Sequence, residues 1–296
     1  MSINSFNDEI KRTAKNYLIQ LENYFKADKA DVLFYYGDID RVYEQVFRNA
    51  LEALVKQHEK NHRETLIIVL QTNGGSVETT EKYVNLIRKY YKKVYFIIPN
   101  YAMSAGTIFC MSGNKIYMDC SSCLGPIDPQ IYSIKEQRFV PANGYLDEIN
   151  AMIEKSKNGT LSNVEFVMCQ NQDLAFLNQC KQTASLAVNL LKEWLVKYKF
   201  SDWKITEERQ ILVTDEYKQE RARDIAEQLG KNSKWHVHSR PIMISELKKL
   251  NIRIDDYTQN EPLKKLIRQY SDYVLQYIQN TQNTPNVRFI HTRLFF

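Results

Sequence analysis

The stretch Thr65-Leu-Ile-Ile-Val-Leu-Gln-Thr-Asn-Gly-Gly75 predicts a buried strand that ends in a tight turn. Its unbroken run of apolar and β-branched residues is typical of a strand covered on both faces. The two glycines then let the backbone adopt positive φ angles or approach another group closely. Similar apolar runs at 32–36 and 94–98 alternate with helical patterns at 41–59 and 77–91. This alternation predicts an α/β fold built on a parallel sheet.

A second turn follows the strand predicted at 94–98, in the segment Tyr101-Ala-Met-Ser-Ala-Gly-Thr107. Ser104 is expected at the start of a helix, between small residues that leave room for a substrate acyl group. A serine in this position is also a common helix N-cap, which is the structural alternative. The glycine turn and the serine turn end adjacent parallel strands, so two sets of backbone N–H groups are expected around one serine. Acyl transfer requires such a nucleophile and such donors.

The rest of the chain divides by its pattern into three parts. An amphipathic helix is predicted within residues 1–30, and the α/β core within 31–200. The core includes helical patterns at 145–154 and a long one at 164–198. Residues 201–296 form a C-terminal helical or mixed extension, with helices predicted at 216–229, 245–250 and 262–279.

Composition limits the classes of partner. The chain has 296 residues, of which 40 are basic and 35 acidic, and the two signs are interspersed, so no nucleic-acid partner is expected. No apolar run approaches the roughly 20 residues of a membrane span. Five cysteines without an export-signal pattern predict reduced thiols and a cytoplasmic protein. Cys120 and Cys123 lack a second ligand pair at a fitting spacing, so no metal and no cofactor is predicted.

The segment from Leu66 to Gln130 resembles the core of the Clp protease/crotonase superfamily. The resemblance is greatest to the branch that contains signal peptide peptidase A and the serine dehydrogenase proteinases. The matching motifs are Gln-Thr-Asn-Gly-Gly at 71–75, Tyr-Ala-Met-Ser-Ala-Gly-Thr at 101–107 and Leu-Gly-Pro-Ile-Asp-Pro-Gln at 124–130. A weaker match covers Trp235-His-Val-His-Ser-Arg-Pro-Ile242.

The resemblance implies a spiral ββα core and a serine peptidase acting on protein or peptide substrates. It implies Ser104 as the nucleophile, with the backbone N–H groups of Gly75 and Ala105 as the oxyanion hole. It also implies a homo-oligomer, because members of the superfamily form trimers, tetramers or stacked rings. Tyr17 and Tyr24 on the N-terminal helix are candidates for part of an interface.

The general base is the least defined part of the resemblance. The Clp protease histidine would fall near Asp128 or Pro129, where this sequence has no histidine. The signal peptide peptidase branch uses a lysine, which acts as a base only if burial lowers its pKa toward neutrality. Position after the nucleophile favours Lys157, then Lys155, with Lys181 third if the long helix crosses the site. The structural alternative is that these are solvated surface lysines.

Histidines near the C-terminus offer another base. His236 and His238 lie on alternate residues of a segment expected to be extended, which would place them on one face. One of them is a candidate base or substrate-steering group, and Asp128 is a candidate for orienting a partner or capping a loop. Two other functions compete with the peptidase: a catalytically inactive peptidase-like scaffold, and a crotonase-type enzyme that binds an acyl-CoA thioester.

Overall fold

The computed structural model describes residues 3–57, 63–134, 136–206, 210–281 and 289–294. Its strands are β1 (Ala30–Tyr36), β2 (Thr65–Gln71), β3 (Lys93–Ile97), β4 (Tyr101–Ala102), β5 (Lys115–Met118), β6 (Cys123–Leu124), β7 (Gln130–Ser133), β8 (Arg138–Pro141), β9 (Ile242–Met243), β10 (Asp255–Asp256) and β11 (Phe289–His291). Its α-helices are α1 (Ile3–Tyr24), α2 (Glu44–Gln57), α3 (Val77–Tyr90), α4 (Ala105–Met111), α5 (Ala142–Lys157), α6 (Asn163–Gln170), α7 (Leu174–Trp194), α8 (Asp215–Gly230), α9 (Asn232–Trp235), α10 (Ile244–Lys249) and α11 (Glu261–Thr281). Short 3-10 turns η1 (Lys26–Asp28) and η2 (Arg41–Tyr43) and a π-helical turn η3 (Leu195–Lys199) complete the described elements.

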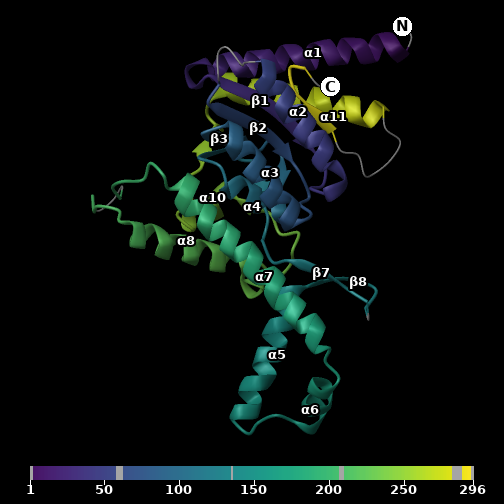
Figure 1. Cartoon of the computed structure of the whole chain (residues 1–296), viewed down its shortest axis with the longest axis vertical. Helices are drawn as coiled ribbons and strands as arrows, with labels where there is room; N and C mark the ends of the chain where they lie inside the picture. Colours follow the sequence, from purple (N-terminus) through teal and green to yellow (C-terminus); the bar gives the residue numbers. More distant parts are fainter. Residues whose placement is uncertain (1–2, 58–62, 135, 207–209, 282–288, 295–296) are drawn as a thin grey trace.

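The main sheet has six strands in the order β10-β5-β3-β2-β1-β11 (Figure 1). All its pairs are parallel except that of β1 with β11. Every residue of β2 is buried, which is why its centre, Leu66 to Leu70, is an unbroken apolar run in the sequence. The predicted α/β fold with a parallel sheet is therefore confirmed.

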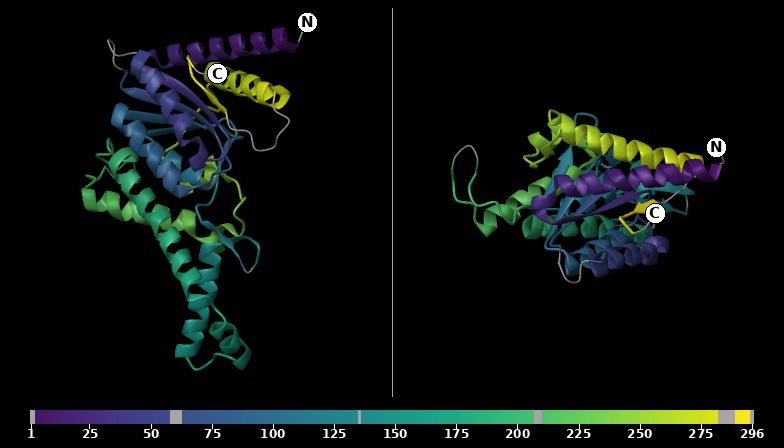
Figure 2. Two further views of the ribbon diagram at one scale, coloured as in Figure 1. Left: turned by 45° about the vertical axis from the view of Figure 1, so that its right-hand side comes forward. Right: turned by 90° about the horizontal axis from the view of Figure 1, so that it is seen from above.

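Helices cover both faces of this sheet, as Figure 2 shows. On one face, α1 and α11 pack on alternate strand residues such as Val32 and Phe34. On the other face, α2, α3, α4, α7 and α8 enclose a core that includes Leu33 and Tyr35. Since successive side chains of a strand point to opposite faces, one apolar run supplies both cores.

The N-terminal helix packs within its own chain. It runs from Ile3 to Tyr24, inside the predicted range 1–30, and lies beside α11. The ring centroids of Tyr17 and Tyr273 are 5.5 Å apart, and Asn260 Nδ2 donates to the Tyr24 hydroxyl over 2.7 Å. Both tyrosines that were candidates for a subunit interface thus contact other residues of the same chain.

The last third of the chain supplies strands to two of the sheets. β11 pairs with β1, with Tyr35 opposite Ile290, and β10 pairs with β5, with Asp255 opposite Tyr117. β9 adds to β6 in a second sheet, β4-β6-β9. The boundary at residue 200 stays a prediction, but the segments beyond it occupy both edges of the main sheet.

An arm projects from the body. It consists of α5 and the first part of α7, with α6 at its far end (Figure 1). The single helix predicted at 164–198 is wrong, because the chain breaks between α6 and α7. Asp173 accepts hydrogen bonds from the N–H groups of Ala175 (2.9 Å) and Phe176 (3.1 Å), and so caps a new helix.

Two other predicted segments differ from the structure. The segment at 235–241 is not extended: His236 has φ 68°, and the N–H of Val237 donates to the Trp235 carbonyl over 2.8 Å. His236 and His238 therefore do not share a strand face. The helix predicted at 41–59 begins as η2 and continues as α2, and its predicted last two residues lie outside the described ones.

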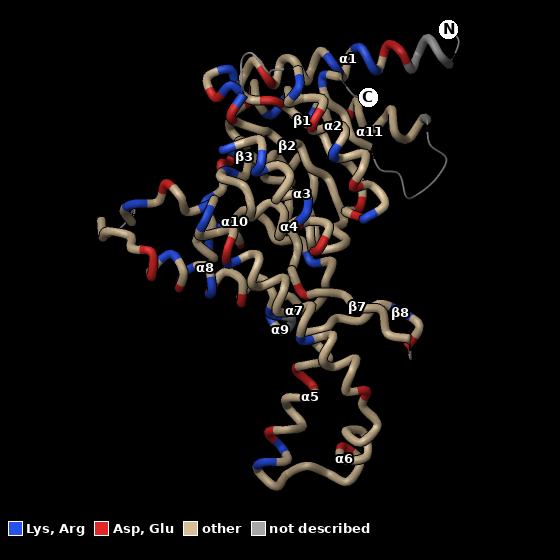
Figure 3. The backbone as a smooth tube through the Cα atoms, in the orientation of Figure 1, with Lys and Arg blue, Asp and Glu red and all other residues tan. Residues whose placement is uncertain are grey.

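The surface carries charges of both signs along the whole described chain (Figure 3). In the part that the structure describes, no helix is both long enough and apolar enough to cross a membrane.

Candidate active site

The double-glycine turn after β2 has a backbone that favours glycine. Gly74 has φ 107° and Gly75 φ 134°, both in the region that L side chains rarely adopt. The preceding loop holds this turn, because the N–H of Ile39 donates to the Gly74 carbonyl over 2.7 Å and the Ile39 carbonyl accepts from Ser76 N–H over 2.9 Å. A Cβ atom on Gly75 would meet the Ile39 carbonyl oxygen at 2.2 Å. The turn is therefore fixed from both sides and leaves no room for a side chain.

Ser104 lies between β4 and α4 with a strained backbone. Its φ is 53° and ψ is −121°, and its side chain makes no capping hydrogen bond to the helix. Such a conformation costs a non-glycine residue about 1–3 kcal/mol and is found mainly at functional sites. A sharp turn between strand and helix also exposes the hydroxyl of nucleophilic serines in other hydrolases. Ser104 therefore occupies the N-cap position of α4, but its hydroxyl does not cap the helix.

The two turns lie against each other. The isolated bridge between Thr72 and Ala102 joins the segments that carry them, and Met103 N–H donates to the Thr72 carbonyl over 2.9 Å. A Cβ atom on Gly74 would lie 2.7 Å from the Ser104 Cβ and 3.1 Å from the Ala105 nitrogen. The sequence prediction that the glycine turn and the serine turn meet is confirmed.

Two backbone donors at this junction have no acceptor among the residues that the structure describes. Neither Gly75 N–H nor Ala105 N–H donates to any group in the described ranges of the chain. Ala105 is the first residue of α4, where N–H groups have no partner within the helix. Gly75 is exposed. This arrangement can hold a negatively charged oxygen beside Ser104.

The segment after β6 runs along the serine turn. Thr107 Oγ1 contacts both backbone groups of Gly125: it accepts from the N–H over 2.9 Å and lies 2.8 Å from the carbonyl oxygen. A Cβ atom on Gly125 would lie 3.2 Å from the Met103 Cα. Thr107 and Gly125 thus hold the chain that leads to Asp128 against the turn that carries Ser104.

Asp128 and His238 form a hydrogen-bonded pair. His238 Nδ1 lies 2.9 Å from Asp128 Oδ1, and Gln130 Nε2 donates to Asp128 Oδ2 over 3.1 Å. The Asp128 side chain is 2% exposed and that of His238 28%. The sequence indicated each residue separately as a candidate for a base or an orienting group, but gave no sign that they meet. His236 is exposed.

The candidate lysines lie in a different environment from the one that a lysine base requires. Lys157 is 65% exposed and its Nζ lies 2.7 Å from Glu154 Oε1. Lys155 pairs with Glu165, whose hydrogen bond raises the pKa of the lysine. Both lie at the end of α5, at the far end of the arm (Figure 1), and Lys181 is exposed on α7. The burial that a lysine base needs is absent at these positions in the described chain.

A partly buried lysine that the sequence did not indicate is Lys199, at the end of η3. Burial lowers its pKa to about 8, with Asp255 opposing the shift. Its neighbour Cys110 is in the last turn of α4, at the other end of that helix from Ser104. Lys199 therefore lies at the opposite end of α4 from Ser104, and we do not assign it as the base.

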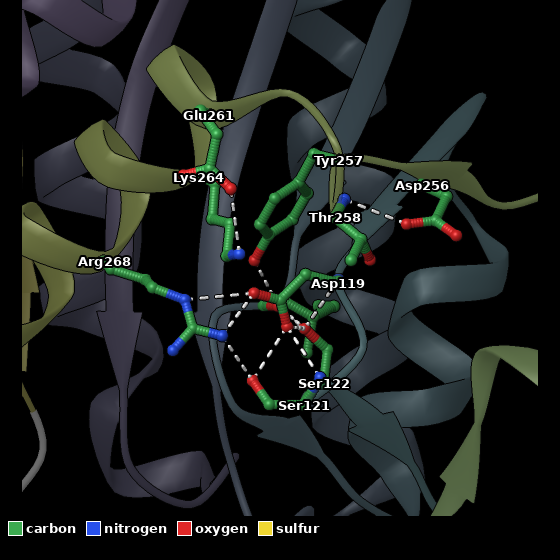
Figure 4. Close-up of polar contacts among 10 residues, drawn as sticks. Asp119, Ser121, Ser122, Asp256, Tyr257, Thr258, Glu261, Lys264 and Arg268 are labelled. Atoms are coloured by element: carbon green, nitrogen blue, oxygen red, sulfur yellow. Dashed lines mark hydrogen bonds and ion pairs between the residues drawn. The ribbon is translucent and has the colours of Figure 1, made fainter.

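A polar cluster at the end of β5 has a structural role (Figure 4). Arg268 on α11 donates to the fully buried Asp119 through Nη2 (2.5 Å) and Nε (3.1 Å), and Ser122 Oγ donates to the Ile98 carbonyl over 2.6 Å. Burial acts to raise the pKa of Asp119, but hydrogen bonds from Arg268 and Ser121 outweigh it and hold that pKa below its usual 3.8. The cluster joins α11 to the strand ends. Among the described residues, no three His, Cys, Asp or Glu side chains gather to hold a metal ion.

The parallel sheet, the glycine turn and the strained serine define a ClpP-like α/β fold. The family described as ClpP-like SDH-type serine proteinase matches residues 44–208, which is more than half of the chain, so the chain belongs to this family. The resemblance predicted from the sequence motifs is confirmed.

Relatives of this chain include two proteins of Methanocaldococcus jannaschii. The uncharacterized protein MJ1495 is 26% identical over 188 residues, which are 64% of this chain and 51% of that protein. The uncharacterized protein MJ0137 is 25% identical over 208 residues, 68% of this chain and 59% of that protein. The chain thus spans between half and three fifths of the length of these curated relatives.

Solved structures similar to this chain include proteases. A variant of the 1510-N membrane-bound stomatin-specific protease has a TM-score of 0.46 and 14% identity, and the match covers 80% of this chain and 83% of that one. ClpP1 from Listeria monocytogenes has a TM-score of 0.39 and 11% identity, covering 80% of this chain and 94% of that one.

Proposed function

We propose that this chain is a serine peptidase that cleaves peptide bonds through an acyl-enzyme, with Ser104 as the nucleophile. One observation carries the proposal: Ser104 has a strained backbone at the start of α4, next to two N–H groups that have no acceptor in the described chain. Strain without a capping bond has no evident structural benefit. Membership of a serine proteinase family supports the same activity.

The chemistry assigns a role to each group. Ser104 Oγ attacks the carbonyl carbon of the substrate peptide and loses its proton to a base. The N–H groups of Gly75 and Ala105 stabilise the oxyanion that develops on the carbonyl oxygen. The C–N bond then breaks, the amine leaves with a proton, and water hydrolyses the ester of Ser104. Removing one such donor typically lowers the rate by about 100-fold to 1000-fold.

A Ser-Lys form of this mechanism would need Lys157 or Lys155 to reach Ser104 from another copy of the chain. Both lysines are at the far end of the arm, with their charges paired to glutamates. A contribution from another copy is a testable form of the lysine-base hypothesis.

We propose further that the chain forms homo-oligomers through the arm. The helix α6 buries no residue of its own, and its large apolar side chains are more than half exposed. An eight-residue helix without buried contacts is not stable by itself in water. A second copy that presents the same apolar face would cover both. The exposed apolar side chains of α6 are Val164, Phe166, Val167 and Met168.

We also propose a cytoplasmic location. All five cysteines are free thiols, of which Cys120 is exposed and Cys123 and Cys169 are partly exposed. Accessible thiols fit a reducing compartment better than an oxidising one.

The test of the peptidase is labelling of the purified protein with a fluorophosphonate probe for serine hydrolases. Wild type should label at one site, Ser104→Ala should not, and Ser239→Ala, a change at an exposed serine beside His238, should label like wild type. Mass spectrometry of the labelled peptide identifies the serine. Cleavage of an unfolded protein substrate should depend on Ser104 in the same way.

The opposite result rejects the proposal. If folded wild type does not label between mildly acidic and mildly alkaline pH, the chain is a binding protein rather than a peptidase. If it instead binds coenzyme A and Ser104→Ala retains that binding, the hypothesis of a crotonase-type acyl-CoA enzyme replaces that of a peptidase.

A further inference from the structure

The pair formed by Asp128 and His238 has the hydrogen bonding of an oriented base. An ionised carboxylate only accepts hydrogen bonds, so the contact of Asp128 Oδ1 with His238 Nδ1 places the ring hydrogen on Nδ1. The other ring nitrogen, Nε2, then presents a lone pair. In the described residues, no other hydrogen bond involves the His238 ring. The second carboxylate oxygen of Asp128 is held by Gln130, which fixes the carboxylate itself.

The register of the small sheet explains why these two residues meet. β6 and β9 are antiparallel, with Leu124 opposite Ile242. Asp128 lies four residues after Leu124, and His238 lies four residues before Ile242. The 2.9 Å contact shows that the two segments still face each other four residues beyond this pair. The two residues are therefore brought together by the sheet, although 110 positions separate them in the sequence.

The same sheet places the segment that leads to Asp128 beside the turn that carries Ser104. β4 and β6 are parallel, with Ala102 opposite Leu124. Ser104 lies two residues past Ala102, which is level with Pro126, and Asp128 lies two residues further along. Two residues of extended chain span about 7 Å, so Asp128 lies within about that distance, along the neighbouring strand, of the level of Ser104. The contacts of Gly125 with Met103 and Thr107 keep the two chains together beyond the paired residues.

We propose that His238 is the general base for Ser104 and that Asp128 is its positioning residue. This inference rests on the proposed peptidase function. Nε2 takes the proton of Ser104 Oγ as the Oγ–C bond forms, and then gives it to the leaving nitrogen as the C–N bond breaks. In the second half, Nε2 takes a proton from water and returns it to Ser104 Oγ when the ester bond breaks. The imidazole is neutral again at the end of each cycle.

The test compares the rate of fluorophosphonate labelling at Ser104 among variants that retain the far-ultraviolet dichroism and melting temperature of wild type. His238→Ala should label about 100-fold more slowly, the size of a typical general-base contribution. Added imidazole should restore part of the rate in this variant. His236→Ala is the matched control, because this histidine is exposed in the same segment, and it should label within about twofold of wild type.

Asp128 is tested by its own pair of variants. Asp128→Asn removes the acceptor charge and should slow labelling by at least about tenfold, since the imidazole loses its preferred tautomer. Asp128→Glu restores a carboxylate and should recover part of the rate. A role in stability alone would lower the melting temperature of both variants without separating their labelling rates.

The outcomes separate this inference from the proposed function. If wild type labels at Ser104 and His238→Ala labels at the same rate, the peptidase stands and the base assignment is overturned. If Lys157→Ala slows labelling while His238→Ala does not, the base is the lysine. If wild type does not label at all, the proposed function is rejected. His238→Gln replaces His238→Ala should the latter fail to fold.

Discussion

Gly74 lies so close to Ser104 that a Cβ atom on the glycine would stand 2.7 Å from the serine Cβ. The same atom would lie 2.8 Å from the Met103 carbonyl oxygen, so the crowding involves backbone as well as side chain. Backbone at this distance cannot rotate away as the end of a long side chain can. The geometry of the serine turn therefore depends on the absence of a side chain at Gly74.

A methyl group at this position should abolish activity. Gly74→Ala is expected to slow labelling of Ser104 by about 100-fold, because it pushes the nucleophile away from its oxyanion donors. The matched control is Gly159→Ala, whose φ is also positive (+67°) but whose added Cβ would meet nothing within 4 Å. The control should lose about 1–2 kcal/mol of stability and keep the labelling rate. Equal rates for the two variants would contradict the packing argument.

Thr107→Val tests the contact between Thr107 and Gly125 that holds the segment leading to Asp128. The valine keeps the shape of Thr107 but leaves the buried N–H of Gly125 without its acceptor. We expect the free energy of unfolding to fall by about 1–3 kcal/mol, measured by urea denaturation. Labelling of Ser104 should also slow, because the segment that carries Asp128 loses its attachment to α4. Unchanged labelling in a destabilised variant would mean that this attachment serves stability alone.

Arg268→Met tests the cluster at the end of β5. The pKa of Asp119 is held below 3.8, so its ionised form stabilises the fold above that pH, and this contribution is lost as the pH falls through the lowered pKa. The variant should be less stable than wild type by about 1–2 kcal/mol at pH 7. The difference should shrink below about pH 4. Lys264→Met, which removes a partly exposed ion pair with Glu261 on the same helix, should cost less than about 0.5 kcal/mol.

His291 should make the fold sensitive to mild acid. Burial, with a smaller contribution from Lys15, lowers its pKa from 6.5 to about 3, so the folded chain keeps this histidine neutral. Its stabilising contribution is complete above pH 6.5 and is lost as the pH falls toward 3. Between pH 6.5 and 5, the free energy of unfolding should fall by up to about 1.4 kcal/mol per pH unit from this group.

His291→Gln should reduce that slope in the same window, whatever its effect on absolute stability. His236→Gln, at an exposed histidine, should leave the slope as it is in wild type. A wild-type stability that is flat between pH 6.5 and 5 would contradict the assignment of a neutral, buried imidazole.

The arm is tested by its effect on oligomer size. Phe166→Glu combined with Val167→Glu places charges on the exposed apolar face of α6. Light scattering coupled to size-exclusion chromatography should find a smaller species than wild type. Val42→Glu, at an exposed valine of η2, is the control and should leave the mass unchanged. A wild-type protein that is monomeric at micromolar concentration would exclude the arm as an interface between copies.

The sequence predicted the core strands and the serine junction because their signals are local. A strand buried on both faces is apolar through its centre, as β2 is from Leu66 to Leu70, and a turn without room for side chains must contain glycine, as at Gly74 and Gly75. The prediction of helices from the sequence pattern failed where the break between two helices is short. The helix predicted at 164–198 is interrupted by only three residues, and the helical periodicity of its two parts concealed the cap at Asp173.

The general base shows the limit of local signals most clearly. Burial decides whether a lysine can act as a base, and the sequence around Lys157 does not report that its side chain is exposed at the end of an arm. Likewise, no sequence spacing relates Asp128 to His238, because the contact arises from the pairing of β6 with β9.

The sequence by itself therefore determined the α/β class, the family, and the place of Ser104 and the glycine turn in the chain. These properties depend on residues close together in the sequence, through side-chain size, backbone freedom and apolar runs. Only the tertiary structure decided which charged groups pair with one another, as Asp128 does with His238, and which face solvent, as Lys157 does. Those properties depend on strand pairing and burial between distant segments, and the free energy of an ionisable side chain changes with its surroundings far more than with its sequence neighbours.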